Sequence, residues 1–332
     1  MSAVHREVID HPAAWTAAGL GGKQALVLDI QADQLDAIDA LLEGTLHLAP
    51  QQIRRADFDH PAINRLMDRV REVLLHGRGC LILGGLAAER YGEEELRRIY
   101  WGLGAHLGAA AVQSVHGDRL GRVETADDDP KKRGYRSLQE LNMHSDSYEI
   151  VGLMSVRAAK AGGISGLVSS LALHNEILRT RPDLLAPLYE GFWYASEEAQ
   201  FDARPVSEVK VPVFSCVDGL VSCHFEIGQL RAAAKRLGVS FPSSFEEAIQ
   251  YFRSLSVRED LALSFLLEPG EILLFHNFTH LHSRTAFENY PERKRLLLRL
   301  WLTPPHGRPC DPAMFARAAT YERLYRESPS YA

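Results

Sequence analysis

The most restrictive feature of the sequence is a stretch near the C-terminus, residues 295–302, in which leucine occupies every second position. On a β-strand, alternate side chains face opposite sides, so four leucines share one face while Arg295, Arg299 and Trp301 share the other. We expect the leucine face to be buried beneath helices and the arginine face to border a polar cavity. A buried arginine keeps its charge and needs an anionic partner. A bound carboxylate and an internal acidic side chain would satisfy it equally well.

The rest of the chain mixes helical and strand patterns. The first third is mainly helical, and the remainder is richer in strands. The ranges with helical spacing are 35–44, 62–77, 93–108, 175–192, 228–238 and 245–255, with a further helix near the C-terminus. The ranges expected as strands are 79–86, 149–158, 166–173, 209–225, 270–276 and 295–302. Asp218 and Gly219 predict a hairpin turn. Because strands follow one another without a regular helix between them, we predict a mainly β core decorated by helices.

Composition narrows the classes of function. The formal net charge is −6, with acidic and basic residues interspersed, so nucleic-acid binding is not expected. No apolar run reaches the roughly 18 residues of a membrane span. The N-terminal segment carries acidic residues and prolines where a signal peptide would be apolar, which predicts a cytoplasmic protein. The charge cluster at 127–133 is interpreted as a solvated loop, with a mobile lid as the alternative.

Several common catalytic motifs are missing from the sequence. The glycines between residues 102 and 108 lie in a helical pattern, whereas a phosphate-binding loop follows a strand. There is no Gly-x-Ser-x-Gly and no His-Glu-x-x-His. The histidines are therefore the remaining candidates for a catalytic site.

Some histidines are followed two positions later by an acidic residue, the spacing of a metal-binding pair. These pairs are His5/Glu7, His116/Asp118, His144/Asp146, His174/Glu176 and His224/Glu226. On an extended segment the two side chains point the same way, whereas on a helix they diverge. That argues against His174, where a helix begins. His144 and Asp146 open into an apolar strand and are the favoured pair, with His116 and Asp118 as the serious alternative.

Further motifs follow the favoured pair along the chain. A Gly-Gly-x-Ser sequence ends at Ser165, and an Asn-x-x-x-Leu-His-x-Arg-Thr-x-Phe sequence spans residues 277–287. An Arg-x-x-x-Arg-x-Trp sequence then begins at Arg295. Together with the His-x-Asp pair, this combination resembles the iron(II)/2-oxoglutarate oxygenases of the taurine dioxygenase and clavaminate synthase type. The resemblance extends from about residue 60 to 304, with His276 as a departure, since relatives usually carry Asp or Asn there.

The resemblance implies a mainly β fold with flanking helices, the double-stranded β-helix, which is a jelly roll of the cupin-like kind. It implies an iron(II) centre with three positions left for 2-oxoglutarate and O2. The match to Leu-His-x-Arg selects His282 as the distal ligand over His276 and His280, which share its strand parity. The implied metal ligands are His144, Asp146 and His282, and the implied 2-oxoglutarate contacts are Arg299 at the distal carboxylate, Ser165, and Arg295 in support.

The implied reaction is the hydroxylation of an unactivated C–H bond in a small molecule, such as an amino acid or a biosynthetic intermediate, with release of succinate and CO2. Relatives also desaturate, epoxidise and close rings. Asp146 favours hydroxylation because halogenases of this broad class carry a small residue at that position. The alternatives are a cupin-like zinc or manganese isomerase or hydrolase, and a non-catalytic small-molecule-binding barrel.

The expected organisation is one oxygenase domain over residues 1–332. Within it, we expect a helical part over about 1–110, a jelly-roll core over about 78–304 and a helical tail over 305–332. The expected partner is a small-molecule substrate, with no nucleic acid and no membrane. The sequence is compatible with any oligomeric state.

Overall fold

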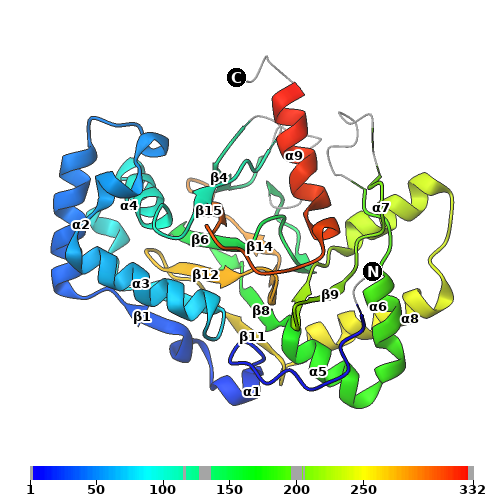
Figure 1. The fold of residues 1–332 in the computed structure, drawn as a ribbon. Coiled ribbons are helices and arrows are strands. Elements are labelled where there is room, and N and C mark those ends of the chain that lie inside the picture. Colours follow the sequence, from blue (N-terminus) through cyan, green and yellow to red (C-terminus); the bar gives the residue numbers. More distant parts are fainter. Residues whose placement is uncertain (1–2, 115–116, 127–135, 196–203, 205, 328–332) are drawn as a thin grey trace.

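Two β-sheets form the centre of the molecule, and helices cover their outer faces (Figure 1). The computed structural model describes residues 3–114, 117–126, 136–195, 204 and 206–327. The larger sheet has the strand order β1-β2-β12-β6-β15-β3, with β4 also paired to β15. Its strands are β1 (Val27–Asp29), β2 (Cys80–Gly84), β3 (Ala109–Ala110), β4 (Leu120–Val123), β6 (Ile150–Arg157), β12 (Ile272–His276) and β15 (Leu296–Thr303). All of these pairs are antiparallel except the parallel pair of β1 and β2.

The smaller sheet is antiparallel, with the strand order β11-β8-β13-β5. Its strands are β5 (Leu141–His144), β8 (Ser165–Ser169), β11 (Ala262–Phe265) and β13 (His280–Arg284). Two short pairs stand apart, β7 (Ala161–Gly162) with β14 (Phe287–Glu288) and β9 (Phe214–Val217) with β10 (Leu220–Cys223). Val151 and Phe275 of the larger sheet share a buried cluster with Leu167 and Phe265 of the smaller one, so the inner faces of the sheets pack together.

Helices from the first third of the chain cover the outer face of the larger sheet (Figure 1). They are α2 (Ala32–Thr45), α3 (Pro61–Leu75) and α4 (Glu93–Gly104). In α3, the buried residues Ile63, Leu66 and Leu74 recur at helical spacing and form one apolar side. Pro61 stands in the first turn, where a missing N–H costs no hydrogen bond. These three helices confirm the sequence prediction for this part of the chain.

The outer face of the smaller sheet is covered by helices from the middle of the chain. They are α5 (Ser170–Thr180), α6 (Leu185–Glu190), α7 (Ile227–Leu237) and α8 (Ser243–Ser256). Val168 and Leu281 of the sheet pack with them in one buried cluster. Two further helices are α1 (Ala17–Leu20) and α9 (Ala316–Glu327), which lie at opposite ends of the view in Figure 1.

Strand β15 has the two different faces that its sequence predicts. Leu298, Leu300 and Leu302 are buried in the cluster that includes α2, α3 and α4. Leu297 and Trp301 belong to the cluster between the two sheets. The leucine face is thus sealed by helices, and the arginine face of the strand looks into the space between the sheets.

The predicted hairpin is present, and one predicted strand is wrong in its second half. Asp218 and Gly219 have φ angles of 51° and 78°, as a tight turn between β9 and β10 requires. The strand expected over 166–173 ends at Ser169, where α5 begins. The hydroxyl of Ser169 accepts a hydrogen bond from the Ala172 N–H (3.0 Å), and this N-cap starts a helix in a sequence that also suits a strand.

Two expectations concern surface features. None of the helices within the described residues has the length and apolar character needed to cross a membrane. The charge cluster at 127–133, interpreted as a solvated loop or a lid, lies outside the described residues.

Candidate metal centre

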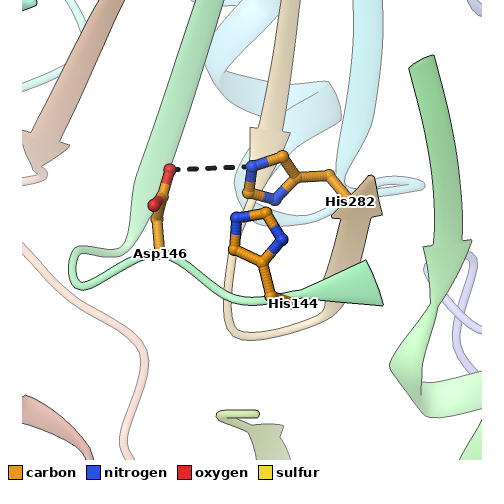
Figure 2. Close-up of side chains that lie close together, drawn as sticks. All are labelled: His144, Asp146 and His282. Carbon is orange, nitrogen blue, oxygen red and sulfur yellow. Dashed lines mark ion pairs between the residues drawn. The ribbon is translucent and has the colours of Figure 1, made fainter. Parts of the chain in front are cut away.

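The pairing of β13 with β5 brings together two histidines from distant parts of the chain. His282 lies opposite His144 in the register of the strands, and the centroids of their rings are 4.2 Å apart. Asp146 follows two residues after His144, and its carboxylate points toward the histidine rings (Figure 2). One possible ligand atom from each residue lies within 4.8 Å of the others. Two imidazoles and one carboxylate are a donor set that suits a divalent transition metal such as iron(II).

Asp146 lies in the loop after β5 and not on the strand itself, which corrects the expectation that one strand carries both residues. Asn277 holds this loop. Its side-chain Oδ1 accepts a hydrogen bond from the Asp146 N–H (2.9 Å), and its Nδ2 donates to the carbonyls of Asp146 (2.9 Å) and Tyr148 (2.8 Å). The Ser145 N–H donates to the carbonyl of Phe225 (2.7 Å). The loop is therefore fixed by side-chain and backbone bonds in place of a sheet.

The carboxylate of Asp146 is buried among donors and positive charge. The indole Nε1–H of Trp301 donates a hydrogen bond to Oδ2 (2.8 Å), and a guanidinium nitrogen of Arg299 lies 3.8 Å from Oδ1. Burial acts to raise the pKa of Asp146, but the neighbouring cations, Arg299 above all, outweigh it and hold this pKa below its usual range. Asp146 is therefore an ionised carboxylate, which is the form that binds a metal ion.

The two histidines offer ring nitrogens as possible ligands. Burial, followed by the nearby His144, lowers the pKa of His282 to about 3, so its imidazole is neutral at ordinary pH. Nδ1 of His144 lies 2.7 Å from the carbonyl of Asn142, a contact that fixes the ring and leaves Nε2 as its ligating nitrogen. Within the described residues, Nδ1 of His282 has no hydrogen-bond partner.

In the described part of the chain, none of the other His-x-Asp/Glu pairs belongs to a cluster of three residues that could bind a metal ion. His174 lies inside α5, and the ring of His5 is 5.8 Å from it. Glu226 caps α7 by accepting hydrogen bonds from two N–H groups of its first turn. Asp118 accepts a hydrogen bond from a nearby serine hydroxyl (2.7 Å), and His116 lies outside the described residues.

The two other histidines of the distal region are buried away from this centre. His276 ends β12, so it does not share a strand with His282, and its Nε2 lies 3.1 Å from Glu149 Oε1. His280 begins β13, and its Nε2 accepts a hydrogen bond from the Trp15 indole (2.9 Å). Each of these histidines has a side-chain partner at Nε2.

A second group of positive charge lies at the start of β15. Arg295 is buried, and its NH1 has no hydrogen-bond partner among the described residues. Arg284 of β13 is its neighbour, and the two guanidinium groups stand 5.1 Å and 4.7 Å from the ring centroid of Phe287. Ser165 lies opposite Arg284 in the register of β8 and β13. Burial lowers the pKa of Arg295 to about 9, and the charge of Arg284 adds to this effect. An anion placed here would compensate that charge.

Two residues at these sites were not given a role from the sequence. Alternation placed Trp301 on the correct face of its strand, but only the fold shows that its indole donates to Asp146. Arg284 lies within the distal motif, two residues after His282. On a strand this spacing predicts that the two side chains lie on the same face of the sheet.

Comparison with known families gives the assignment. The family model described as taurine catabolism dioxygenase TauD, TfdA family matches residues 44–301, which is more than half of the chain. The chain belongs to this family. As a member of the TauD/TfdA family it is a dioxygenase and hence an oxidoreductase, which confirms the class predicted from the sequence motifs.

Individual proteins support the family assignment. FR-33289 synthase of Streptomyces rubellomurinus is 27% identical over 286 residues, covering 81% of this chain and 83% of that protein. The taurine hydroxylase-like protein SAT17 of Stachybotrys chartarum is 26% identical over 321 residues, covering 88% of this chain and 81% of that protein. Both matches extend over most of the two proteins.

Solved structures share the fold of this TauD/TfdA family member. An asparagine oxygenase in complex with Fe(II), a hydroxyasparagine and succinate superposes with a TM-score of 0.67 at 14% identity, covering 84% of this chain and 93% of that one. The non-haem iron oxygenase OrfP, in complex with Fe and α-ketoglutaric acid, gives a TM-score of 0.61 at 15% identity, covering 83% of this chain and 94% of that one. The mixed sheets with covering helices are thus a known oxygenase fold.

Proposed function

We propose that this protein is an iron(II)- and 2-oxoglutarate-dependent oxygenase that hydroxylates a C–H bond of a small molecule. The observation that carries the proposal is the meeting of His144, Asp146 and His282, whose ligand atoms lie within 4.8 Å of one another. Two histidines and one carboxylate are the protein ligands of non-haem iron(II) oxygenases, and they leave positions open for other ligands. Membership of the TauD/TfdA family supports the same chemistry.

For the distal carboxylate of 2-oxoglutarate we propose Arg295 as the main partner, with Ser165 beside it. This revises the expectation that Arg299 takes that role. Arg299 lies 3.8 Å from Asp146, and its Nε donates a hydrogen bond to Gln113 (2.8 Å), so its charge already has an anionic neighbour. Arg295 is buried and has no ion pair within the described residues, so a bound carboxylate would supply the missing counter-charge.

The proposed reaction consumes the small molecule, 2-oxoglutarate and O2. One oxygen atom of O2 enters the C–H bond of the small molecule, and the other enters succinate as 2-oxoglutarate loses CO2. The bound iron(II) would supply the redox chemistry with O2. The protein would hold the ion through His144, Asp146 and His282 and orient 2-oxoglutarate through Arg295. Burial of Asp146, His282 and Arg295 would exclude bulk water from their side of the site.

The fold suits this function in its finer detail. We propose that the facing sheets form a jelly roll and that residues 1–332 make a single oxygenase domain with a helical N-terminal part and a helical tail. For the substrate, structurally similar proteins were solved with a hydroxyasparagine and with hydroxylated arginine, which supports an amino acid or a similar small molecule.

The function is tested by the visible charge-transfer band that forms when 2-oxoglutarate chelates iron(II) in the absence of O2. Wild-type protein should give the band, and His282→Ala should lose it together with iron binding, because a three-ligand site has no spare donor. Asp118→Ala, which alters the alternative pair, should keep it. A band of wild-type intensity in His282→Ala, or its loss in Asp118→Ala, would refute the assigned ligands.

A further inference from the structure

A cavity of about 460 Å³ lies between α7, α9 and the segment around Tyr194. Much of its wall is small and apolar, including Ala195 and Ala316. Two polar side chains, Gln229 of α7 and Arg317 of α9, stand in this wall and are themselves buried. Charged side chains, Arg204, Glu208 and Arg323, also line the cavity, so apolar and polar groups share its wall, and small-molecule sites combine groups of both kinds.

The side-chain amide of Gln229 is the first sign that a ligand belongs here. Gln229 is 2% exposed, and neither its Nε2 nor its Oε1 has a hydrogen-bond partner within the described residues. Its backbone is fixed, because its N–H donates to Glu226 (2.6 Å) and its carbonyl accepts from Ala195 (3.2 Å). A buried amide without partners destabilises the fold, so its retention is explained by a partner that the protein alone does not supply.

Arg317 gives the cavity its charge. Its side chain is buried in the wall, and its Nε donates to the neutral hydroxyl of Tyr321 (3.3 Å). Glu208, an acidic residue among the described residues of the wall, forms an ion pair with Arg204 (2.5 Å). The wall near Gln229 contains the Arg317 guanidinium as well as the Gln229 amide, and donor groups of these two kinds together suit an oxyanion.

Two chains of contacts connect the cavity wall to the candidate metal centre. On one side, the ring of Tyr194 lies 5.3 Å from that of His224, and the next residue, Phe225, accepts a backbone hydrogen bond from Ser145. On the other side, the ring of Tyr321 lies 6.0 Å from that of Trp301, which donates to Asp146. These contacts link the wall of the cavity, through Tyr194 and through α9, to the loop that carries Asp146.

We propose that this cavity receives the primary substrate and that Arg317 and Gln229 bind an oxyanion group on it, such as a carboxylate or a phosphonate. The proposal rests on the proposed function, since it places the substrate beside the iron site. Helix α9 then forms part of the active site, and Arg317 determines which substrates enter.

The test uses protein loaded with iron(II) and saturating 2-oxoglutarate under nitrogen, with three probes of one shape. Phenylacetate and benzylphosphonate carry an oxyanion, and phenylacetamide is their neutral counterpart. Calorimetry should show at least one oxyanion binding about tenfold or more tightly than the amide, a difference of about 1.4 kcal/mol. The preferred oxyanion distinguishes a carboxylate substrate from a phosphonate. Equal affinities of all three probes, or no binding, would overturn the proposal.

Single-residue variants distinguish the recognition of the oxyanion from an effect on folding. Arg317→Gln should abolish the oxyanion preference, and Arg317→Lys should retain part of it, because the charge remains. Arg326→Gln, an exposed arginine on the same helix, is the matched control and should bind as the wild type does. Gln229→Leu should weaken oxyanion binding severalfold without loss of thermal stability, because it removes an unsatisfied buried amide. An unchanged preference in Arg317→Gln would refute the assignment.

Measurements on the same samples distinguish a failure of the substrate site from a failure of the proposed function. The visible band of the 2-oxoglutarate chelate reports on the iron site alone. A wild type that shows the band but no oxyanion preference refutes only the substrate site. A wild type that lacks the band refutes the proposed function, and the substrate proposal falls with it.

Discussion

Asp146 occupies an environment that stabilises its negative charge from several directions. An indole N–H, a guanidinium and two imidazoles surround it, and they come from strands β5, β13 and β15. Because these groups keep the carboxylate ionised, a metal ion does not have to displace a proton from it. The hydrogen bond from Trp301 also selects the orientation of the carboxylate. Partners of this kind commonly change the affinity of a metal site by 10–100-fold.

Replacement of Trp301 by Phe should therefore weaken iron(II) binding by about 10–100-fold while the fold persists. The aromatic ring would still fill the space between the sheets, but the donor to Asp146 would be gone. Equilibrium titration of iron(II) under nitrogen measures the effect. Trp101→Phe is the matched control, because its indole donates to the Ile53 carbonyl (2.9 Å) in the helical layer. Equal iron affinity in the two variants would contradict the role assigned to Trp301.

The two arginines of β15 should differ in what they control. Arg295→Gln should raise the 2-oxoglutarate concentration needed for half-maximal chelate formation by about 100-fold, because a buried carboxylate would lose its charged partner. Arg299→Gln should act mainly on iron affinity through Asp146. Titration of 2-oxoglutarate at saturating iron(II), followed by the visible band, separates these effects. If Arg299→Gln raised the 2-oxoglutarate requirement more than Arg295→Gln did, Arg299 would be the partner of the distal carboxylate.

Strand β15 joins the helical layer to the catalytic layer. Its leucine face lies against α2, α3 and α4, while Trp301 and the arginines lie between the sheets. The alternation of one short segment was enough to predict both faces, because strand geometry depends only on local sequence. The junction of β8 and α5 was not predictable in this way. Leu167 to Leu173 suits either structure, and the cap at Ser169 decides the outcome.

The helical layer should contribute stability rather than catalysis. Leu298 is fully buried on the leucine face, so Leu298→Ala should lower the free energy of unfolding by about 2–5 kcal/mol through lost burial and a cavity. Urea unfolding measures this change. At urea concentrations well below the unfolding midpoint, Leu298→Ala loaded with iron(II) and 2-oxoglutarate should show the visible band at the wild-type wavelength. Leu220→Ala, at a partly exposed position in the β9–β10 hairpin, is the control and should cost far less.

The whole molecule explains which parts of the site could be predicted from sequence. His144 and His282 lie in local motifs, so their spacing was visible, and β13 then places them in register. The bond between Asn277 and Asp146 spans 131 positions of sequence and depends on the packing of both sheets. The choice between Arg295 and Arg299 depends on which guanidinium has an acidic neighbour. Only the assembled fold provides that information.

The buried histidines predict that the stability of the whole molecule falls at acidic pH. The pKa is lowered to about 3, with burial as the largest cause, at His174, His224, His280 and His282. In the unfolded chain these imidazoles take up protons near pH 6.5, whereas the folded protein keeps them neutral. Acid therefore favours the unfolded state. Stability should be complete above about pH 6.5 and should fall as the pH drops toward 3, by up to about 1.4 kcal/mol per pH unit for each histidine.

His174 allows this prediction to be tested away from the metal ligands. Its Nε2 contacts the Tyr189 hydroxyl (3.0 Å), and its Nδ1 has no hydrogen-bond partner within the described residues. His174→Gln removes a titrating group and keeps a polar atom for the tyrosine. Urea unfolding of metal-free protein at several pH values between 7.5 and 5 should give a shallower loss of stability for the variant, by about 1.4 kcal/mol per pH unit at the acidic end. If the variant and the wild type lose stability in parallel, folding does not lower the pKa of His174, and its burial does not exclude the charge.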